Sequence, residues 1–459
     1  MIKSKSNIYV IVILVLSVSI ASVGTLAASH ELSLEEALIL GMENNVGLRE
    51  VKHDQNIAEI DLNSAKKAFY PEVSISSTYT KLSKGPSIPS FDIKPDPEPE
   101  NPQFPFEFVT TTMEGPTDNY QTSISLQQPI YLGGKIWLGM EQAEKGLDAA
   151  DMQILQKKNE LYLQIIQSYY NVLLAEERVN IEEDALELVR EHRKTTESGL
   201  SAGVTLKTDL LQVEIEEGGA VQSLAVARND LMMAKKVLGN TIGMDLLDRD
   251  FSWPSISPSI ELEKNLQVEL ARGNRPELEL LELNEEILEI NLKMEENSHL
   301  PNIVLQGNYQ WQGDELRFED GTGSLTLALS MNIFDRGLSQ NREDKLQEDL
   351  AKLNLNKSNL EELMEIEIEE LILTIEESRN NIKLQQLNLK KAEENLELET
   401  KRYQAGMGTN INVMNAQLMM KQTRIALMQA EYQHKINLFK LLQKTGRLIE
   451  FCEGEIINE

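Results

Sequence analysis

The sequence predicts an α+β membrane protein in which one structural plan occurs twice along the chain. Three observations lead to this prediction. Four segments of about ten residues alternate apolar with polar side chains, the pattern of a strand with two different faces. Two proline-free runs, residues 135–200 and 338–403, have the apolar spacing of long helices. Similar short motifs recur at a fixed offset, as expected of an internal duplication.

Residues 1–28 have the features of a secretory signal peptide. Two lysines precede an unbroken apolar run at 8–16, and small or apolar residues continue to the end of the segment. The run is shorter than the roughly 20 apolar residues that a membrane-spanning helix needs. We therefore expect export from the cytoplasm, with cleavage after Ala27 or Ala28. An uncleaved anchor helix is the alternative interpretation.

The composition is strongly acidic, with 74 Asp and Glu against 44 Lys and Arg and a formal net charge of −30. Loss of the two signal-peptide lysines would make the mature chain about −32, which argues against binding DNA or RNA. Most acidic residues lie in the helical runs, where a solvated acidic face or a salt-loving host would explain them. The single cysteine, Cys452, excludes an internal disulfide and leaves none at the cleavage site for a lipid anchor.

The duplication is visible at two offsets. Residues 130–134 recur as residues 333–337, which lie 203 residues later. Nearer the N-terminus, residues 70–73 correspond to residues 300–303 at an offset of 230. The first half therefore contains an insertion of 27 residues.

These offsets divide the chain into a first structural repeat at 29–250, a linker at 251–262, a second repeat at 263–446 and a C-terminal tail at 447–459. The insertion falls in residues 83–118, a segment with eight prolines. We expect an irregular loop there, between two strands. Proline-rich segments also serve as docking peptides, which is the alternative interpretation.

The alternating segments match membrane-crossing strands. They lie at 73–80, 123–127, 303–311 and 325–333, and a tilted strand needs about ten residues to cross a bilayer. Aromatic residues near their loop-side ends would suit an interfacial girdle, namely Tyr79, Tyr120, Tyr309 and Trp311. A soluble four-stranded sheet with one buried face fits the alternation equally well.

A barrel made of these strands requires several chains. Four strands cannot close a barrel, and lipid does not tolerate open sheet edges because their backbone groups would lack partners. Two chains would supply eight strands and an interior filled by side chains. Three chains would supply twelve strands and leave room for a pore.

Each long helical run ends at a glycine-containing turn. At about 1.5 Å per residue, such a run extends roughly 100 Å. In the second run, apolar residues from Ile368 to Leu396, followed by Tyr403, recur every seven positions, which indicates a coiled-coil seam. Turns at Gly203 and Gly406 lead into a second helical stretch in each half, so we expect two helical hairpins. An extended coiled coil without a lumen is the alternative.

Together these features resemble the TolC-type outer-membrane efflux family, the outer membrane factors, over essentially the whole mature chain. No single motif is decisive, but their order and spacing are specific. The motifs are the start at Leu32–Leu38, in which Ser33 and Glu36 can form a capping box, the strand entry Tyr70-Pro71, the strand exit at Gln128–Lys135, and Arg402–Gly406 followed by Asn412–Gln417.

The resemblance implies a homotrimer in the cell outer membrane with a large periplasmic portion. Its twelve-stranded β-barrel, four strands per protomer, would continue as a long periplasmic α-helical coiled-coil barrel. Such a porin-like channel conducts substrates passively to the exterior in a tripartite efflux pump or a type I secretion system. The implied partners are outer-membrane lipid, a periplasmic adaptor (membrane fusion) protein and an inner-membrane transporter of the RND or ABC type.

In this family the hairpin tips narrow the periplasmic entrance, and acidic residues just after the second glycine turn line it. The corresponding residues here are Asn412 and Asn415, so the resemblance implies a polar but neutral constriction. Tyr403 matches a tyrosine that helps to hold the tips closed, and Asp209 matches its partner on the first hairpin. Gly408 replaces an arginine of some members, which implies fewer charged links. A tyrosine at a heptad position can equally be plain packing.

No residue pattern points to an enzyme. The five histidines are dispersed without metal-ligand spacing, and the sequence has no phosphate-binding glycine loop, paired-cysteine motif or G-x-S-x-G turn. We expect no catalytic residue, cofactor or metal site. A different class of function, a non-porous periplasmic coiled-coil scaffold or adaptor, remains the alternative to a channel.

Overall fold

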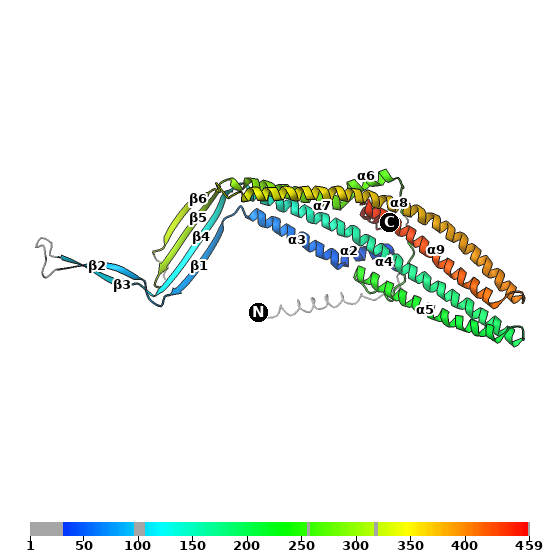
Figure 1. Cartoon of the computed structure of the whole chain (residues 1–459). Coiled ribbons are helices and arrows are strands. Elements are labelled where there is room, and N and C mark those ends of the chain that lie inside the picture. The colour runs from blue at the N-terminus through cyan, green and yellow to red at the C-terminus, as the bar shows by residue number, and fades with distance from the viewer. Residues whose placement is uncertain (1–30, 96–105, 255–257, 316–319, 458–459) are drawn as a thin grey trace, which may run out of the picture. The chain divides into compact units, whose positions relative to one another are not determined.

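The computed structural model describes residues 31–95, 106–254, 258–315 and 320–457 (Figure 1). The expected signal peptide lies outside these residues. The chain forms two compact units. The first comprises the described parts of Met1–Val51, Ile154–Pro276 and Leu360–Glu459, and the second comprises those of Lys52–Gln153 and Glu277–Asn359.

The second unit contains an antiparallel sheet of four strands in the order β1-β4-β5-β6. The strands are β1 (Glu72–Lys81), β4 (Asp118–Leu132), β5 (Asn302–Gly313) and β6 (Thr322–Ser330). All four predicted strands are therefore confirmed, although β6 ends before Ile333, which the alternation had included. The β4–β5 register shifts between Pro129 and Tyr131, as expected where a proline lacks its backbone N–H.

The sheet has one polar and one apolar face. On the polar face, Ser74 pairs with Ser125 and Ser76 with Ser123, at Oγ–Oγ distances of 2.7 and 2.9 Å. The apolar face is not covered by any other part of the described chain. Five of its side chains are 63 to 74 % exposed, namely Val73, Ile75, Leu325, Leu327 and Leu329. A soluble sheet ordinarily packs such a face against a helix or a second sheet.

The segment 83–118 is not an irregular loop throughout. It contains β2 (Ser87–Pro95) and β3 (Phe106–Glu114), which pair antiparallel over nine residues each. The expectation was wrong for these residues because alternating large side chains outweighed the prolines. Pro89 and Pro95 are compatible with β2. Along a strand, backbone N–H groups point alternately toward and away from the partner strand, and both prolines occupy positions that point away from β3.

Helices make up most of the first unit, and in the second unit helices precede and follow the strands along the chain. The two longest, α4 (Lys135–Ser201) and α8 (Leu338–Gln404), have 67 residues each, so both predicted helical runs are confirmed. They begin 203 residues apart, which is the repeat offset, and the duplication itself stays a prediction. The other helices are α2 (Leu34–Asn44), α3 (Val46–Lys67), α5 (Lys207–Ile242), α6 (Lys264–Asn274), α7 (Pro276–Glu296), α9 (Asn410–Lys444) and α10 (Leu448–Phe451), with short turns at Asn297–His299 and Cys452–Ile456.

The core of the first unit joins α2, α4, α5, α9 and the C-terminal helices. Leu38, Ile165, Tyr169, Phe439 and Leu448 are among its fully or almost fully buried members. The hydroxyl of Ser33 accepts a hydrogen bond from the backbone N–H of Glu36 at 3.1 Å, as expected of the N-cap of α2. Among the described residues, no helix is both long enough and apolar enough to span a membrane.

Candidate functional site at the hairpin tips

Both long helices end in tight turns of the same geometry. Gly203 joins α4 to α5 with φ of 76°, and Gly406 joins α8 to α9 with φ of 72°. In the first turn the N–H of Gly203 donates to the carbonyl of Leu200 at 3.0 Å. In the second the N–H of Gly406 donates to the carbonyl of Tyr403, also at 3.0 Å. Glycine suits both positions because this left-handed backbone costs a residue with a Cβ atom about 1–2 kcal/mol.

A second glycine accommodates a close approach in each tip. A Cβ atom on Gly408 would lie 2.9 Å from the backbone nitrogen of Tyr403 and 3.2 Å from the Cβ of Arg402. At the repeat offset, Arg402 and Gly408 correspond to Gly199 and Thr205, and a Cβ on Gly199 would collide with the Thr205 hydroxyl. Each tip therefore has one glycine in the contacting pair. In the first tip it is the residue before the turn, Gly199, and in the second it is the residue after the turn, Gly408. A side chain at residue 408 would therefore require Arg402 or the neighbouring backbone to shift.

Asn410 links three helices through one side chain. It begins α9 and is only 4 % exposed. Its Oδ1 lies 2.6 Å from Nε2 of His192 on α4. Its Nδ2 lies 3.3 Å from the Asp209 carbonyl and 3.3 Å from Oε1 of Gln212, both on α5. The sequence analysis missed Asn410, because its partners lie about 200 residues away and no local pattern marks them.

His192 is buried beside this amide, and burial lowers its pKa. The neutral ring then donates from Nε2 to the Asn410 oxygen, while the Asn410 amide donates onward to α5. The ring of His192 also lies edge-on to that of Tyr403, with centroids 5.0 Å apart. The two hairpins of one chain are therefore joined by a buried, mutually satisfied polar cluster.

The predicted pair Tyr403 and Asp209 lines one open cavity of about 680 Å³ at the tips. Among the hydrogen bonds of the described chain, however, the two side chains have other partners. The Tyr403 hydroxyl lies 3.2 Å from Oγ1 of Thr196. The Asp209 carboxylate accepts from the backbone N–H of Leu206 at 3.4 Å, at the start of α5. Among the described residues of one chain, no hydrogen bond joins these two side chains, and their role as a tether stays a prediction.

Asn412 and Asn415 are both exposed on the first turns of α9. The amide of Asn412 lies 3.4 Å from Oε2 of Glu399, which also pairs with Arg402 at 2.9 Å. A carboxylate therefore lies beside the neutral position 412. Sequence matching missed Glu399, because this carboxylate lies on α8, before the glycine turn, and not after it.

Further along, polar contacts continue between α4 and α9. Lys421 pairs with Glu182 at 3.2 Å, and Arg424 pairs with Glu177 at 3.2 Å and with Asp184 at 2.5 Å. The Glu182 side chain is only 5 % exposed. These contacts hold the first hairpin against the second.

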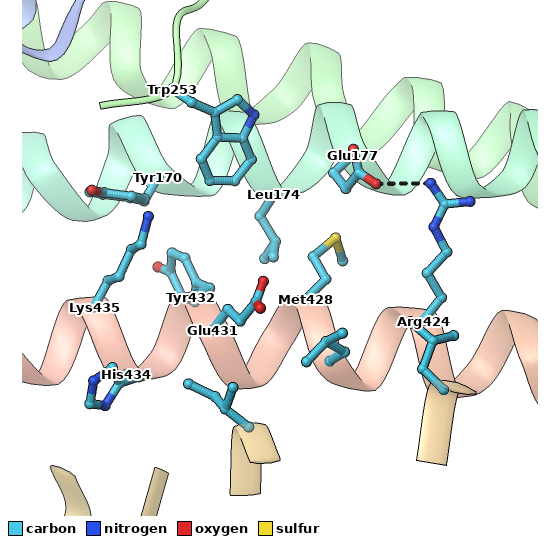
Figure 2. Close-up of a pocket in the computed structure, with 13 residues that line it drawn as sticks. Tyr170, Leu174, Glu177, Trp253, Arg424, Met428, Glu431, Tyr432, His434 and Lys435 are labelled. Carbon is cyan, nitrogen blue, oxygen red and sulfur yellow. Dashed lines mark hydrogen bonds and ion pairs between the residues drawn. The ribbon is translucent and has the colours of Figure 1, made fainter. Parts of the chain in front are cut away.

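A second cavity, of about 570 Å³, lies between α4 and α9, with walls from α8 and the linker residue Trp253 (Figure 2). The Lys435 ammonium lies 5.5 Å from the ring centroids of both Tyr170 and Trp253. Figure 2 shows the aromatic side chains Tyr170, Trp253 and Tyr432 grouped at one end of this cavity, beside Lys435. Arg424 at the other end is held by Glu177. The walls of this cavity are therefore mainly aromatic and apolar. Its two cationic side chains have partners, Lys435 the aromatic rings and Arg424 the Glu177 carboxylate.

The described residues contain no group of three or more His, Cys, Asp or Glu side chains that could hold a metal ion. The contacts seen at the tips are hydrogen bonds, ion pairs and tight turns. Such an arrangement can stabilise one position of the hairpins and release it when the contacts break.

The chain is similar to proteins of one known family. The family model described as Outer membrane efflux protein matches residues 40–243 and 268–447. The outer membrane efflux protein BepC of Brucella suis is 21 % identical over 420 residues, which cover 91 % of this chain and 86 % of that protein.

Two solved structures share the fold. The CusC structure aligns with a TM-score of 0.74 and 16 % identity, and covers 90 % of this chain and 92 % of that one. The outer membrane protein VceC from Vibrio cholerae aligns with a TM-score of 0.71 and 15 % identity, and covers 90 % and 96 %. The family model spans most of both halves, including both hairpin tips and the polar cluster between them, and so this chain belongs to the outer membrane efflux protein family.

Proposed function

We propose that this protein is the exit duct of a tripartite efflux pump or type I secretion system. Three copies would form a channel that passively conducts substrates from an inner-membrane transporter and a periplasmic adaptor to the exterior. The observation that carries this proposal is the four-stranded sheet. It has a polar face, an apolar face and two edges, and no part of the described chain covers that apolar face or pairs with those edges.

The two faces support a sheet that separates lipid from water. Leu325, Leu327 and Leu329 form an apolar row on β6, and Val73 and Ile75 continue that face on β1. The serine pairs between β1 and β4 lie on the opposite face and suit a water-filled lumen. A non-porous scaffold would leave the apolar row in water, where burying it would be favourable at about 25 cal/mol per Å².

The two edges support the trimer. β1 and β6 each have one side without a strand partner in the described chain. In lipid, unpaired backbone groups cost several kcal/mol each, so β1 of one copy would pair with β6 of the next. Three copies would supply twelve strands, enough for a barrel with a pore.

The hairpin tips would form the periplasmic entrance, with Asn412 and Asn415 lining the constriction and Tyr403 and Asp209 tethering its closed state. A periplasmic membrane fusion protein would dock on the tips and favour the open state by binding it better. An RND or ABC transporter would supply the substrates. The outer-membrane location is supported by the names of the relatives, and the helical hairpins would extend into the periplasm.

Two measurements on the mature protein test the proposal. They are its mass in detergent and its conductance after insertion into a planar bilayer. We expect a trimer that conducts ions across a planar bilayer. A stable monomer in plain buffer, without conductance, would instead support the scaffold.

The constriction is tested by charge. Asn412→Asp with Asn415→Asp should increase cation preference, because carboxylates in a narrow entrance attract cations. Asn412→Gln with Asn415→Gln keeps both positions neutral and serves as the matched control. Equal ion selectivity in the two double variants would show that the constriction lies elsewhere.

A further inference from the structure

The cavity of about 570 Å³ between α4 and α9, called the aromatic cavity below, interrupts the coiled-coil seam of α8 (Figure 2). Along that seam, Ile368 and Ile375 are buried. One and two heptads further on, Ile382 and Leu389 are partly exposed and line the cavity. Seam residues of a continuous coiled coil fill the space between helices. The chain therefore leaves room here for a small molecule, since pockets of about 300–1,000 Å³ hold drug-sized ligands.

The walls of the aromatic cavity suit an apolar ligand with a flat part. The three helices contribute aliphatic side chains and a thioether, namely Leu174, Ile382, Leu389, Leu427 and Met428. The indole of Trp253 is 57 % exposed, and Figure 2 shows it near Tyr170 and Tyr432 at one end of the cavity. An exposed aromatic ring offers a surface on which a planar group can stack.

The same end carries a positive charge without a negative partner. The Lys435 ammonium lies over the rings of Tyr170 and Trp253, and none of the ion pairs of the described chain includes it. By contrast, Arg424 at the other end is neutralised by Glu177 at 3.2 Å. Aromatic rings attract an ammonium group but do not cancel its charge. An anionic group entering this end would therefore gain an ion pair that the described chain does not supply.

The remaining ionisable groups of the walls do not exclude an anion. Glu431 lies one helical turn before Lys435, but it is exposed, so water and salt screen its charge. Burial lowers the pKa of His434, whose Nδ1 lies 2.8 Å from Oγ of Ser378, and this favours the neutral ring. The charge that selects a ligand is therefore that of Lys435.

We infer that the aromatic cavity binds an amphipathic organic anion, an apolar molecule that carries one carboxylate or sulfonate group. The anionic group would pair with Lys435, and the apolar part would lie against Trp253 and the aliphatic side chains of α8. Such a ligand would connect the linker to three helices. All residues that line the cavity belong to one compact unit of a single chain, so the inference does not depend on the proposed trimer or on conduction.

Calorimetric titration with naphthalene-2-sulfonate tests the site in the mature protein, held in nanodiscs of zwitterionic lipid, with empty nanodiscs as the blank. Two matched probes are 2-naphthylmethylammonium, a cation of similar shape, and neutral 2-naphthalenemethanol. We expect one sulfonate per chain, bound about ten times more tightly than either matched probe, because only the sulfonate pairs with the ammonium. Equal binding of all three probes, or tighter binding of the cation, would overturn the inference.

Variants then locate the anionic group. Lys435→Gln should weaken sulfonate binding by about tenfold or more, whereas Lys435→Arg should retain it. Glu431→Gln should strengthen binding by about twofold, because a nearby negative charge is lost. Lys440→Gln is the matched control, since Lys440 is also on α9 but does not line the cavity. Parental affinity in Lys435→Gln would overturn the site, and the three-probe comparison decides independently if that variant does not fold.

Discussion

Two neighbouring buried tyrosines in α4 differ in whether their hydroxyl groups form hydrogen bonds. Tyr169 and Tyr170 are both almost fully buried, and burial raises the pKa of each to about 12. The Tyr169 hydroxyl lies 2.7 Å from the carbonyls of both Leu32 and Ser252, and so connects α4 to the N-terminal segment and the linker. The Tyr170 hydroxyl has no hydrogen-bond partner in the described chain.

Removing these two hydroxyls should therefore have different effects. Tyr169→Phe should lower the free energy of unfolding by about 1 kcal/mol, the typical net value of a buried hydrogen bond. Tyr170→Phe should cost nothing or stabilise slightly, because an unsatisfied hydroxyl leaves the core. Thermal unfolding followed by circular dichroism measures both. A larger loss for Tyr170→Phe would show that its hydroxyl has a partner in the assembled protein.

His192 should make the tips sensitive to pH. Its native pKa is lowered by burial, so the neutral form is favoured in the folded state. The stability that His192 contributes is then complete above its unfolded pKa of about 6.5 and is lost as the pH falls from there toward the lower native value. The cavity wall beside the ring carries Glu191 from α4 and Tyr403 from α8, whereas Val413 and Gln417 of α9 are uncharged.

We expect the proposed channel to open more readily below about pH 6.5, the ordinary pKa of histidine, than at pH 8. The readout is open probability in planar bilayers. His192→Gln can still donate to the Asn410 oxygen but cannot titrate, so it should remove this pH dependence. A pH response of parental size in His192→Gln would assign the titration to another group.

At the scale of elements, the ion pair between Glu182 of α4 and Lys421 of α9 is more buried than the other ion pairs of this contact. The Glu182 and Lys421 side chains are 5 and 20 % exposed. By contrast, Lys401 and Glu397 on α8 are 66 and 65 % exposed and form an ordinary surface pair. Loss of one member of a buried pair leaves a charge without compensation, whereas exposed pairs contribute little.

Lys421→Met should therefore destabilise the protein by about 2 kcal/mol or more, because the Glu182 carboxylate stays buried without its partner. Adding Glu182→Leu to Lys421→Met should recover most of that loss. Lys401→Met is the surface control and should have no measurable effect. Denaturant unfolding gives the comparison, and additive losses in the double variant would contradict the argument.

At the scale of the whole molecule, the two faces of the sheet should tolerate charge differently. Leu327 lies on the apolar face opposite Leu305, and the adjacent Thr326 lies on the polar face opposite Gln306. Leu327→Lys should impair assembly in the outer membrane, since a lysine at mid-bilayer costs about 2–4 kcal/mol on a lipid-facing strand. Thr326→Lys should assemble normally. Equal yields of the proposed trimer from the two variants would show that neither face contacts lipid.

Much of the secondary structure follows from local pattern. The helical period starting at Lys135 predicts a helix to residue 200, and α4 ends at Ser201. The alternation around Ser74 and Ile75 predicts β1 with its faces assigned. The prolines in residues 83–118 misled the prediction, because a proline whose N–H would face away from the partner strand is compatible with a hairpin, and that orientation is not visible in composition.

The sequence by itself determined the four strands, the two long helices and the glycine turns at Gly203 and Gly406, because periodicity and left-handed turns depend on residues only a few positions apart. Only the tertiary structure decided which side chains meet at the tips. Asn410 reaches His192, 218 residues away, and Tyr403 reaches Thr196, 207 residues away. Such pairings depend on how α4 lies against α8 and α9, which is fixed by packing along whole helices and leaves no trace in any short segment of sequence.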